Sequence, residues 1–343
     1  MWEDTQLEKH MHDMLSQEFN TREAEMYYRQ YGSARDYLEQ QIFPFIPAVE
    51  SQLTDHTEKH VEDVLKKSML LLHDEISNFN AVELYLLCMC VLFHDCGNIH
   101  GRDEHEKKIA DIYDEIVGSN STRTQERRLV LAVVKAHSGI SRKGDKDTLI
   151  DVVEQTSLYD KEVRLREIAG ILRLADELAE GPQRTSSYML EHNTKLTQDG
   201  LQPIIDNNSL IYHKYASVTH IFVDKGNGRL VLTYNIEIPV CKISFSNLLS
   251  FIYKRIVKLD SERRYCKYYA PSLEKFKRTE ATINISHKGE DVIDIPLIEL
   301  GDKYAVLAES VEDVILSRYP AIEENALKTQ IKEKGYSYDE ESI

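Results

Sequence analysis

The sequence has little of what a secreted, membrane-spanning or fibrous protein requires. Its 343 residues include eight prolines and fourteen glycines, too few for a collagen repeat or a Pro/Gly-rich disordered tract. Five cysteines, an odd number in a long chain, fit no disulfide framework, so we expect reduced, mostly buried thiols. The longest apolar run, Leu84 to Phe93, has ten residues, whereas a membrane span needs about 20. The N-terminus lacks the basic start and apolar stretch of a secretory signal, so we expect a soluble, cytoplasmic protein.

The sequence also has fewer positively charged than negatively charged residues. The chain has 42 Lys and Arg against 58 Asp and Glu, which gives a formal net charge of -16. Such a surface repels a phosphate backbone, so general nucleic-acid binding is not expected. Hydrophobic residues make up 42% of the chain, enough to bury at least one sizeable core.

The pattern along the chain divides it into three parts. Residues 1–48 are polar with a few apolar positions at helical spacing, and we expect a helical arm that ends near Pro44 and Pro47. Residues 49–186 contain amphipathic helices and no convincing strand. In residues 187–343, β-branched and aromatic residues alternate and Gly-containing turns appear. The predicted fold is mainly α: an all-helical domain followed by a smaller α+β C-terminal module.

The expected elements follow from the same periodicities. In the helical part we expect helices over residues 55–76, 81–95, 104–117, 124–137, 149–157 and 161–179. In the C-terminal module we expect a hairpin with strands 219–224 and 229–234 around a four-residue loop, a helix over 246–268, a strand over 281–286 and a helix over 302–319.

Metal-preferring side chains recur at the ends of apolar helical faces. On the helix over 161–179, Leu165, Ala169 and Leu172 share one face, and Asp176 falls on that face one turn later. Burying an unpaired carboxylate is costly, so this Asp should meet a cation or reach solvent.

Histidines occupy the same kind of position on three other helices. Apolar positions lead to His94 and Asp95 in one helix and to His137 in another, and His56 and His60 lie one turn apart on a third. A single histidine of this kind is usually a hydrogen-bonded core residue. Four helices that each deliver an imidazole or carboxylate to a buried end favour a metal site. Mixed nitrogen and oxygen ligands suit Mn, Fe, Co, Ni or Zn better than Ca.

The order of these residues resembles a known family. His60, the pair His94-Asp95 thirty-four positions later, and Asp176 eighty-one positions after Asp95 resemble the H…HD…D signature of the HD superfamily of metal-dependent phosphohydrolases. The resemblance covers about residues 50–186. It implies that these four residues hold one or two divalent ions, which can be Mg as well as Mn, Fe, Co, Ni or Zn.

The resemblance implies roles for further residues. His105 and His137 match family histidines that complete a second metal site or bind phosphate, and His100 is a weaker match. The opening around His56 and His60 resembles the cyclic-nucleotide phosphodiesterase branch, in which the first histidine protonates the leaving group. We therefore expect His56, with His105 as second choice, to be the proton donor. Asp95 would position the nucleophile.

The sequence lacks motifs that define several branches of the HD superfamily. The segment Cys96-Gly97-Asn98 lacks the phosphate-binding Lys of many bacterial members, and no Gly-Tyr-Pro motif of cyclic-di-GMP phosphodiesterases follows it. The Glu-Asp pair of guanosine-tetraphosphate hydrolases and the Pro-Pro-Phe-Gly-His segment of dGTP triphosphohydrolases are also missing. The sequence is loosely similar to the HD branch of bacterial conflict systems, in which an α+β extension follows the HD domain.

The expected function is hydrolysis of a phosphoester or phosphoanhydride bond of a nucleotide by metal-activated water. Arg102, Arg184 and His137 are the candidate substrate-binding residues. Two alternatives remain open: a nucleotide-sensing module that signals to a protein partner, and a single-strand nuclease. The arm over residues 1–48 suggests packing on a neighbouring subunit, so a homo-oligomer is expected.

Overall fold

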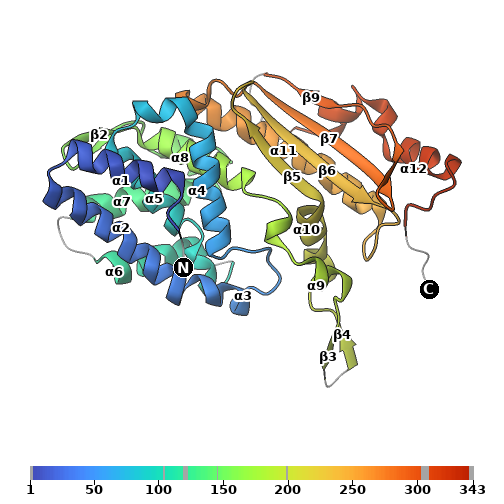
Figure 1. Cartoon of the computed structure of the whole chain (residues 1–343), viewed down its shortest axis with the longest axis horizontal. Helices are drawn as coiled ribbons and strands as arrows, with labels where there is room; N and C mark the ends of the chain where they lie inside the picture. The colour runs from blue at the N-terminus through green and yellow to red at the C-terminus, as the bar shows by residue number, and fades with distance from the viewer. Residues whose placement is uncertain are drawn as a thin grey trace. The chain divides into compact units, whose positions relative to one another are not determined.

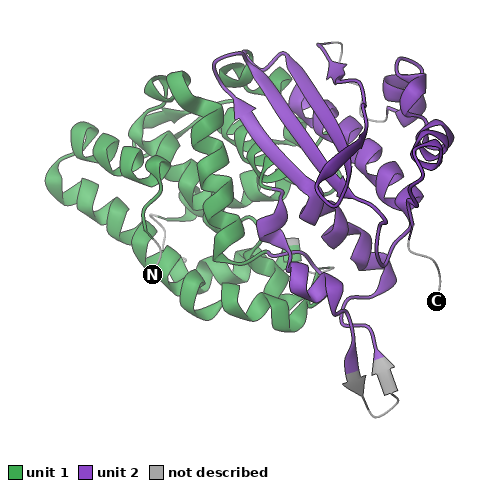
Figure 2. Cartoon of the chain, turned by 45° about the vertical axis from the view of Figure 1, so that its right-hand side comes forward, with its two compact units in different colours: residues 1–51, 56–179, 266–274 green, residues 52–55, 180–265, 275–343 purple. Residues whose placement is uncertain are grey.

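The computed structural model describes residues 3–102, 105–118, 123–144, 146–197, 200–302 and 309–339. The chain forms two compact units (Figure 2). The first unit comprises residues 1–51, 56–179 and 266–274, and the second comprises residues 52–55, 180–265 and 275–343. The first is helical and the second contains the main sheet, which confirms the predicted mainly α fold with a smaller α+β part.

Eight helices build the first unit in the part of the chain that the structure describes (Figure 1). They are α1 (Gln6–Glu18), α2 (Thr21–Gln41), α3 (Ile46–Val49), α4 (Glu58–Leu72), α5 (Ala81–Phe93), α6 (His105–Val117), α7 (Thr124–Ala136) and α8 (Leu165–Leu178). The expected helix over 55–76 is shorter, because His73 ends it with a φ of 38°.

Helix α5 is the centre of this unit. All of its residues are buried, and it contacts α1, α2, α4, α7 and α8. The side chain of Asn80 accepts hydrogen bonds from the first turn, and Glu83 returns a bond to the Asn80 backbone, so a capping box fixes its start. The segment Ala81–His100 is long and apolar enough to cross a membrane, but 94% of its most apolar 18-residue stretch is buried in the protein. The apolar run is therefore a core helix.

The N-terminal arm packs on its own chain. Leu7, Met11 and Leu15 of α1 and Leu38 of α2 are fully buried. Both helices contact α5, and α1 also contacts α4. The three ranges 1–48, 49–186 and 187–343 stay a prediction about domains, and the homo-oligomer stays a prediction as well.

The prediction of no strand between residues 49 and 186 was wrong. A short hairpin of β1 (Thr156–Leu158) and β2 (Lys161–Val163) replaces part of two expected helices. The first of these helices is shortened to Leu149–Asp151, and the second begins only at Leu165. Its turn residues Tyr159 and Asp160 have φ of 50° and 59°, the geometry of a two-residue hairpin turn. The hydroxyl of Tyr159 donates to the buried Glu126. This tertiary bond overrides the helical pattern.

The second unit is built around a mixed five-stranded sheet. Strands β5 (Thr219–Asp224), β6 (Arg229–Glu237), β7 (Arg278–His287) and β8 (Glu290–Ile293) lie in this order, and β9 (Ile298–Leu300) pairs with β7. Asp224 pairs with Arg229, which confirms the predicted hairpin and its four-residue loop. Strands β6 and β7 are parallel, and the long helix α11 (Phe245–Tyr269) lies in the connection between them.

The remaining elements of the second unit are smaller. They are α9 (Ser187–Glu191), β3 (Lys195–Thr197), β4 (Gly200–Gln202), α10 (Asn207–Val218) and α12 (Glu324–Glu333). Of the expected helix over 302–319, residues 303–308 lie outside the described residues, and Glu312–Leu316 forms a π-helical turn.

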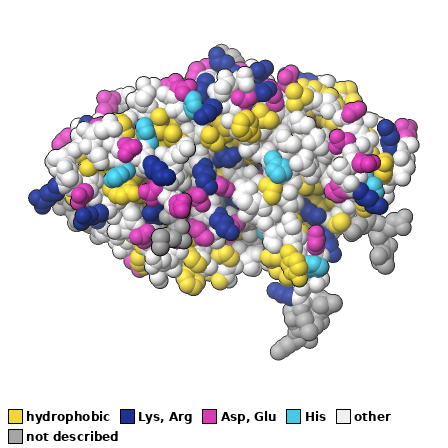
Figure 3. Space-filling view, viewed as in Figure 1, with side chains coloured by type: hydrophobic (Ala, Val, Ile, Leu, Met, Phe, Trp, Pro, Cys, Tyr) yellow, Lys and Arg dark blue, Asp and Glu magenta, His cyan; other side chains and the backbone are white. Residues whose placement is uncertain are grey.

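Charged side chains of both signs are mixed on the face drawn in Figure 3. Lys and Arg side chains alternate with Asp and Glu, and the hydrophobic side chains lie in small groups.

Candidate metal centre

Three packed helices of the first unit place the predicted ligands at one point. His94 and Asp95 directly follow α5, His60 lies in the first turn of α4, and Asp176 lies in the last turn of α8. Because α5 contacts both α4 and α8, these helix ends meet. One ligand atom from each of the four residues lies within 4.8 Å of the others. The predicted cluster is therefore present.

The distances in this cluster fit a small cation. The Nε2 atoms of His60 and His94 are 3.3 Å apart, and Oδ1 of Asp176 lies 3.1 Å from the first and 3.7 Å from the second. Oδ2 of Asp95 lies 3.9 Å from His60 Nε2 and 3.6 Å from His94 Nε2. Ligands about 2.0–2.2 Å from a metal at tetrahedral angles lie about 3.4 Å apart. The four atoms fit a divalent ion with modest adjustment.

Backbone carbonyls fix the histidine tautomers. Nδ1 of His94 donates to the Val91 carbonyl at 2.8 Å, Nδ1 of His105 donates to the Arg102 carbonyl at 2.6 Å, and Nδ1 of His137 donates to a carbonyl in the preceding turn. A carbonyl can only accept, so in each neutral ring Nε2 carries the lone pair. Hydrogen bonds of this kind, from the ring nitrogen that does not face the metal, orient metal-ligating imidazoles.

The two oxygens of Asp95 face different histidines. Oδ2 faces His60 and His94 and lies 3.7 Å from Nε2 of His56, whereas Oδ1 lies 3.7 Å from Nε2 of His137. Asp95 is 5% exposed, so both contacts are shielded from solvent. This is the arrangement of a carboxylate that can bind on both sides, and it brings His56 and His137 to the edge of the cluster.

The charges of the cluster depend strongly on one another. Burial raises the pKa of Asp95, but His94, His137 and His56 outweigh it and hold that pKa well below its usual range. The pKa of Asp176 is likewise lowered despite burial, by His60 and His94. Burial lowers the pKa of His94, yet Asp95 and Asp176 raise it to about 9. Two ionised carboxylates therefore attract a positive charge to this point.

Comparison of the sequence with known protein families assigns the chain to one of them. The family HD-CE matches residues 50–238, more than half of the 343 residues. The chain belongs to the HD-CE family. The HD-CE match includes all four residues of the cluster and runs past the helical part to the end of β6. No curated protein and no solved structure shows detectable similarity to the chain.

In this HD-CE chain, His105 is buried close to the segment that follows Asp95. A Cβ at Gly97 would overlap the carbonyl oxygen of His105, so only glycine allows α6 to begin so near this segment. His105 is 8% exposed, and its Nε2 has no hydrogen-bond partner among the residues that the structure describes. Its lone pair is thus buried and available, although its assignment as a ligand stays a prediction.

The other predicted residues are placed differently. The side chain of Arg102 is exposed, as is that of His100. Arg184 is buried in the second unit, where its Nε donates to the Asp55 carbonyl at 2.9 Å and its own carbonyl accepts from the Asp55 N–H at 2.8 Å. The structure therefore gives Arg184 a role in holding the chain just before His56, and its contact with substrate stays a prediction.

Two residues of this HD-CE chain had no signal in the sequence. Oε1 of Glu50 accepts the backbone N–H of Arg102 at 2.6 Å and thereby ties down the loop that leads to His105. Asn98 is fully buried, and across the described part of the chain neither atom of its side-chain amide finds a hydrogen-bond partner. Neither residue belongs to a periodic pattern, so only tertiary structure reveals them.

Proposed function

We propose that this HD-CE protein is a metal-dependent phosphohydrolase that cleaves a phosphoester or phosphoanhydride bond of a nucleotide. The observation that carries the proposal is the cluster of His60, His94, Asp95 and Asp176, in which two imidazoles and two carboxylates meet at one mostly buried point. Nitrogen and oxygen ligands together suit Mn, Fe, Co, Ni or Zn, and the two carboxylates also admit Mg.

The residues of the cluster would hold the cation so that its positive charge can act on the substrate. When bound, a divalent cation polarises a phosphoryl oxygen and lowers the pKa of the water it holds. Asp95 and Asp176 supply negative charge, while His60 and His94 supply imidazole nitrogens. The second oxygen of Asp95, on the side of His137, can accept a hydrogen bond from the nucleophile and orient it.

His56 is the residue best placed to give a proton to the leaving oxygen. Its Nε2 lies 3.7 Å from Oδ2 of Asp95, so it borders the cluster without belonging to the four-residue set. Its side chain is 11% exposed, which leaves access to a substrate at the surface of the site. An imidazole near neutral pH is a suitable general acid. His105 is the second candidate.

The substrate is proposed to be small and phosphorylated. The net charge of -16 disfavours a long polyanion, but a local cation can still meet a phosphate. Arg102, exposed three residues before His105, is the first candidate for that contact, with His137 and Arg184 as further candidates.

The test is turnover of nucleotides by the full-length protein. Purified protein is incubated with Mn²⁺ or Mg²⁺ and a panel of nucleoside mono-, di- and triphosphates and cyclic nucleotides, and released phosphate and nucleoside products are measured. We expect turnover of at least one nucleotide that EDTA abolishes and that falls at least about 100-fold in Asp95→Ala. The matched control is Asp111→Ala, because Asp111 is exposed on α6 and forms a surface pair with Lys108.

The other outcomes separate the alternatives. Tight nucleotide binding with no turnover under any metal would contradict the hydrolase and favour the sensor. Cleavage confined to single-stranded oligonucleotides, with affinity that falls steeply with salt, would favour the nuclease.

A further inference from the structure

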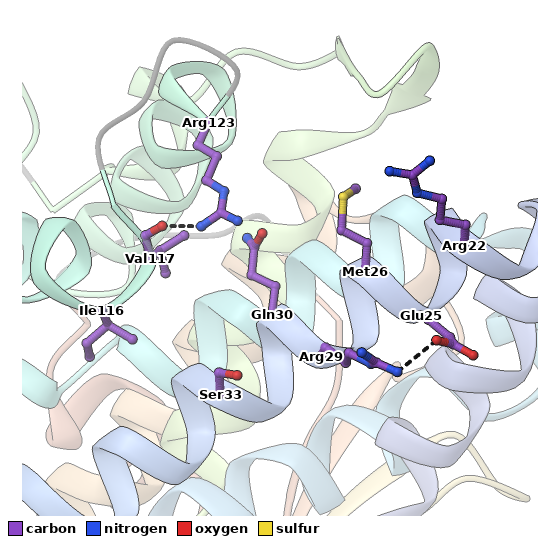
Figure 4. A pocket seen from close by; sticks show the side chains of 9 residues that line it. All are labelled: Arg22, Glu25, Met26, Arg29, Gln30, Ser33, Ile116, Val117 and Arg123. Atoms are coloured by element: carbon purple, nitrogen blue, oxygen red, sulfur yellow. Dashed lines mark hydrogen bonds and ion pairs between the residues drawn. The ribbon is translucent and has the colours of Figure 1, made fainter.

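A groove with an arginine-rich lining lies in the first unit at the far ends of two helices that lead to the metal centre. It runs between α2 and the place where α6 ends and α7 begins, and its volume is about 450 Å³ (Figure 4). Helix α6 has His105 as its first residue and Val117, in the groove, as its last. Helix α7 is preceded by Arg123, in the groove, and followed by His137. Each helix is about 20 Å long, so groove and centre are separate sites.

The lining of the groove is positively charged in an acidic protein. Arg22, Arg29 and Arg123 line it together with one carboxylate, that of Glu25. Nη2 of Arg29 lies 2.9 Å from Oε2 of Glu25, so this carboxylate neutralises one arginine. Among the described residues of the lining, three arginines accompany one carboxylate, whereas the whole chain has a net charge of -16.

Two of the lining residues are held in position by the fold. The guanidinium of Arg123 donates to the carbonyl of Val117, which fixes it across the end of α6. The side-chain amide nitrogen of Gln30 donates at 2.7 Å both to Oε1 of Glu126 and to the hydroxyl of Tyr85. Gln30 thereby connects the lining of the groove to the buried residues Tyr85 and Glu126.

The rest of the lining suits the non-phosphate part of a small molecule. Met26, Ile116 and Val117 form an apolar part, and Ser33 adds a hydroxyl. Sites for small molecules have volumes of about 300–1,000 Å³ and combine apolar walls with a few polar groups. Guanidinium groups bind phosphate with two parallel hydrogen bonds. Figure 4 shows the side chains of Arg22 and Arg29 on α2 and the side chain of Arg123 beside Val117.

We infer that this groove is a binding site for a small phosphorylated anion, distinct from the metal centre. The phosphate is held by Arg22 and Arg29 from α2 and by Arg123 from the opposite side. The apolar part contacts the remainder of the ligand.

The test is titration of the full-length protein with inorganic pyrophosphate by calorimetry, in EDTA. EDTA removes any divalent ion that could bind the probe at the metal centre, and the variants of the groove show whether the remaining binding occurs there. We expect one pyrophosphate per chain, bound more weakly as salt rises. The double variant Arg22→Gln/Arg29→Gln should weaken binding at least tenfold, and Glu25→Gln should strengthen it.

The control is Arg128→Gln, because Arg128 is exposed on α7 and does not line the groove. It removes the same charge from the protein and should change the affinity less than twofold. Circular dichroism verifies that each variant is folded, which is expected because the altered side chains of α2 are exposed. Absence of pyrophosphate binding at millimolar concentration, or binding that the double variant leaves unchanged, would overturn the inference.

Discussion

Nε2 of His60 faces Nε2 of His94 at 3.3 Å in the interior of the first unit. The His94 ring donates its Nδ1–H to the Val91 carbonyl, so its Nε2 carries a lone pair whenever the ring is neutral. The contact with His60 Nε2 is a hydrogen bond when one of the two nitrogens carries a proton, whereas a metal ion between them would need the lone pairs of both. The nearby carboxylates of Asp95 and Asp176 favour positive charge there, in line with the His94 pKa of about 9. Proton and metal ion therefore compete for one place.

Metal affinity is expected to rise with pH. Below about 9 the metal-free protein carries a proton on His94, and a cation must displace it. Each displaced proton weakens apparent affinity about tenfold per unit of pH below the pKa. Calorimetric titration with Mn²⁺ at pH 6.5, 7.5 and 8.5 measures this, and buffers of different ionisation enthalpy count the released protons. An affinity that is constant over this range would show that His94 is not protonated.

Stability of the metal-free protein is expected to fall at both ends of the pH scale. The folded-state pKa of His94 is raised, so its contribution is fully present below 6.5 and is lost as pH rises through about 9. The pKa values of Asp95 and Asp176 are lowered, so their contribution is present above 3.8 and is lost as pH falls below it. Thermal unfolding in EDTA should show greatest stability between these limits. The alkaline decline should be smaller in His94→Gln, and an equal decline there would assign it to other groups.

Replacing His56 and replacing His60 are expected to have different effects on bound metal and on turnover. His60→Gln removes a proposed ligand, so bound metal and turnover should both be lost. His56→Gln should keep the metal but lower kcat by about 100-fold or more, the usual contribution of a general acid. Elemental analysis of the purified variants, together with kinetics, distinguishes the two. Equal loss of metal in both variants would make His56 a ligand instead of a proton donor.

A buried carboxylate far from the metal centre is expected to be important for stability. Glu126 is fully buried and accepts hydrogen bonds from Tyr113 at 2.6 Å, Tyr85 at 3.1 Å and Gln30 at 2.7 Å, and from Tyr159 as well. Removing one partner from a buried hydrogen bond costs about 1–3 kcal/mol, and several are lost together. Glu126→Ala should therefore lower the free energy of unfolding by at least about 3 kcal/mol in urea titration.

The matching control for Glu126 is two residues away on the same helix. Arg128 is exposed, and Arg128→Ala should change the free energy of unfolding by no more than about 0.5 kcal/mol. A loss below about 1 kcal/mol in Glu126→Ala would contradict the structural role of this network.

The four cluster residues could be predicted because local periodicity places three of them and the resemblance to the H…HD…D signature joins them with Asp95 in one site. Each of His60, His94 and Asp176 extends an apolar face by one helical turn, and each lies near the end of a helix whose boundary is marked by composition. The hairpin of β5 and β6 was equally visible, because its strands alternate and its loop contains two glycines.

Features that depend on tertiary contacts could not be predicted. The hairpin of β1 and β2 has strands of three residues, too short for a period, and its turn depends on the bond from Tyr159 to Glu126. Glu50 accepts a hydrogen bond from the backbone, and Asn98 is distinguished by its burial. Neither property can be recognised in the hydrophobic pattern of the sequence. The continuous helix α11 belongs to both units, with its last residues from Cys266 onward in the first, so no composition shift marks that boundary. Cytoplasmic location and self-association stay predictions.

Pulsed electron paramagnetic resonance of the full-length protein with stoichiometric Mn²⁺ tests the central claim most directly. The account predicts tightly bound Mn²⁺ whose signal shows coupling to imidazole nitrogen. That coupling should disappear when His60 and His94 are both replaced by Gln. Weakly bound Mn²⁺ without nitrogen coupling in the unaltered protein, or coupling that survives the double replacement, would contradict it.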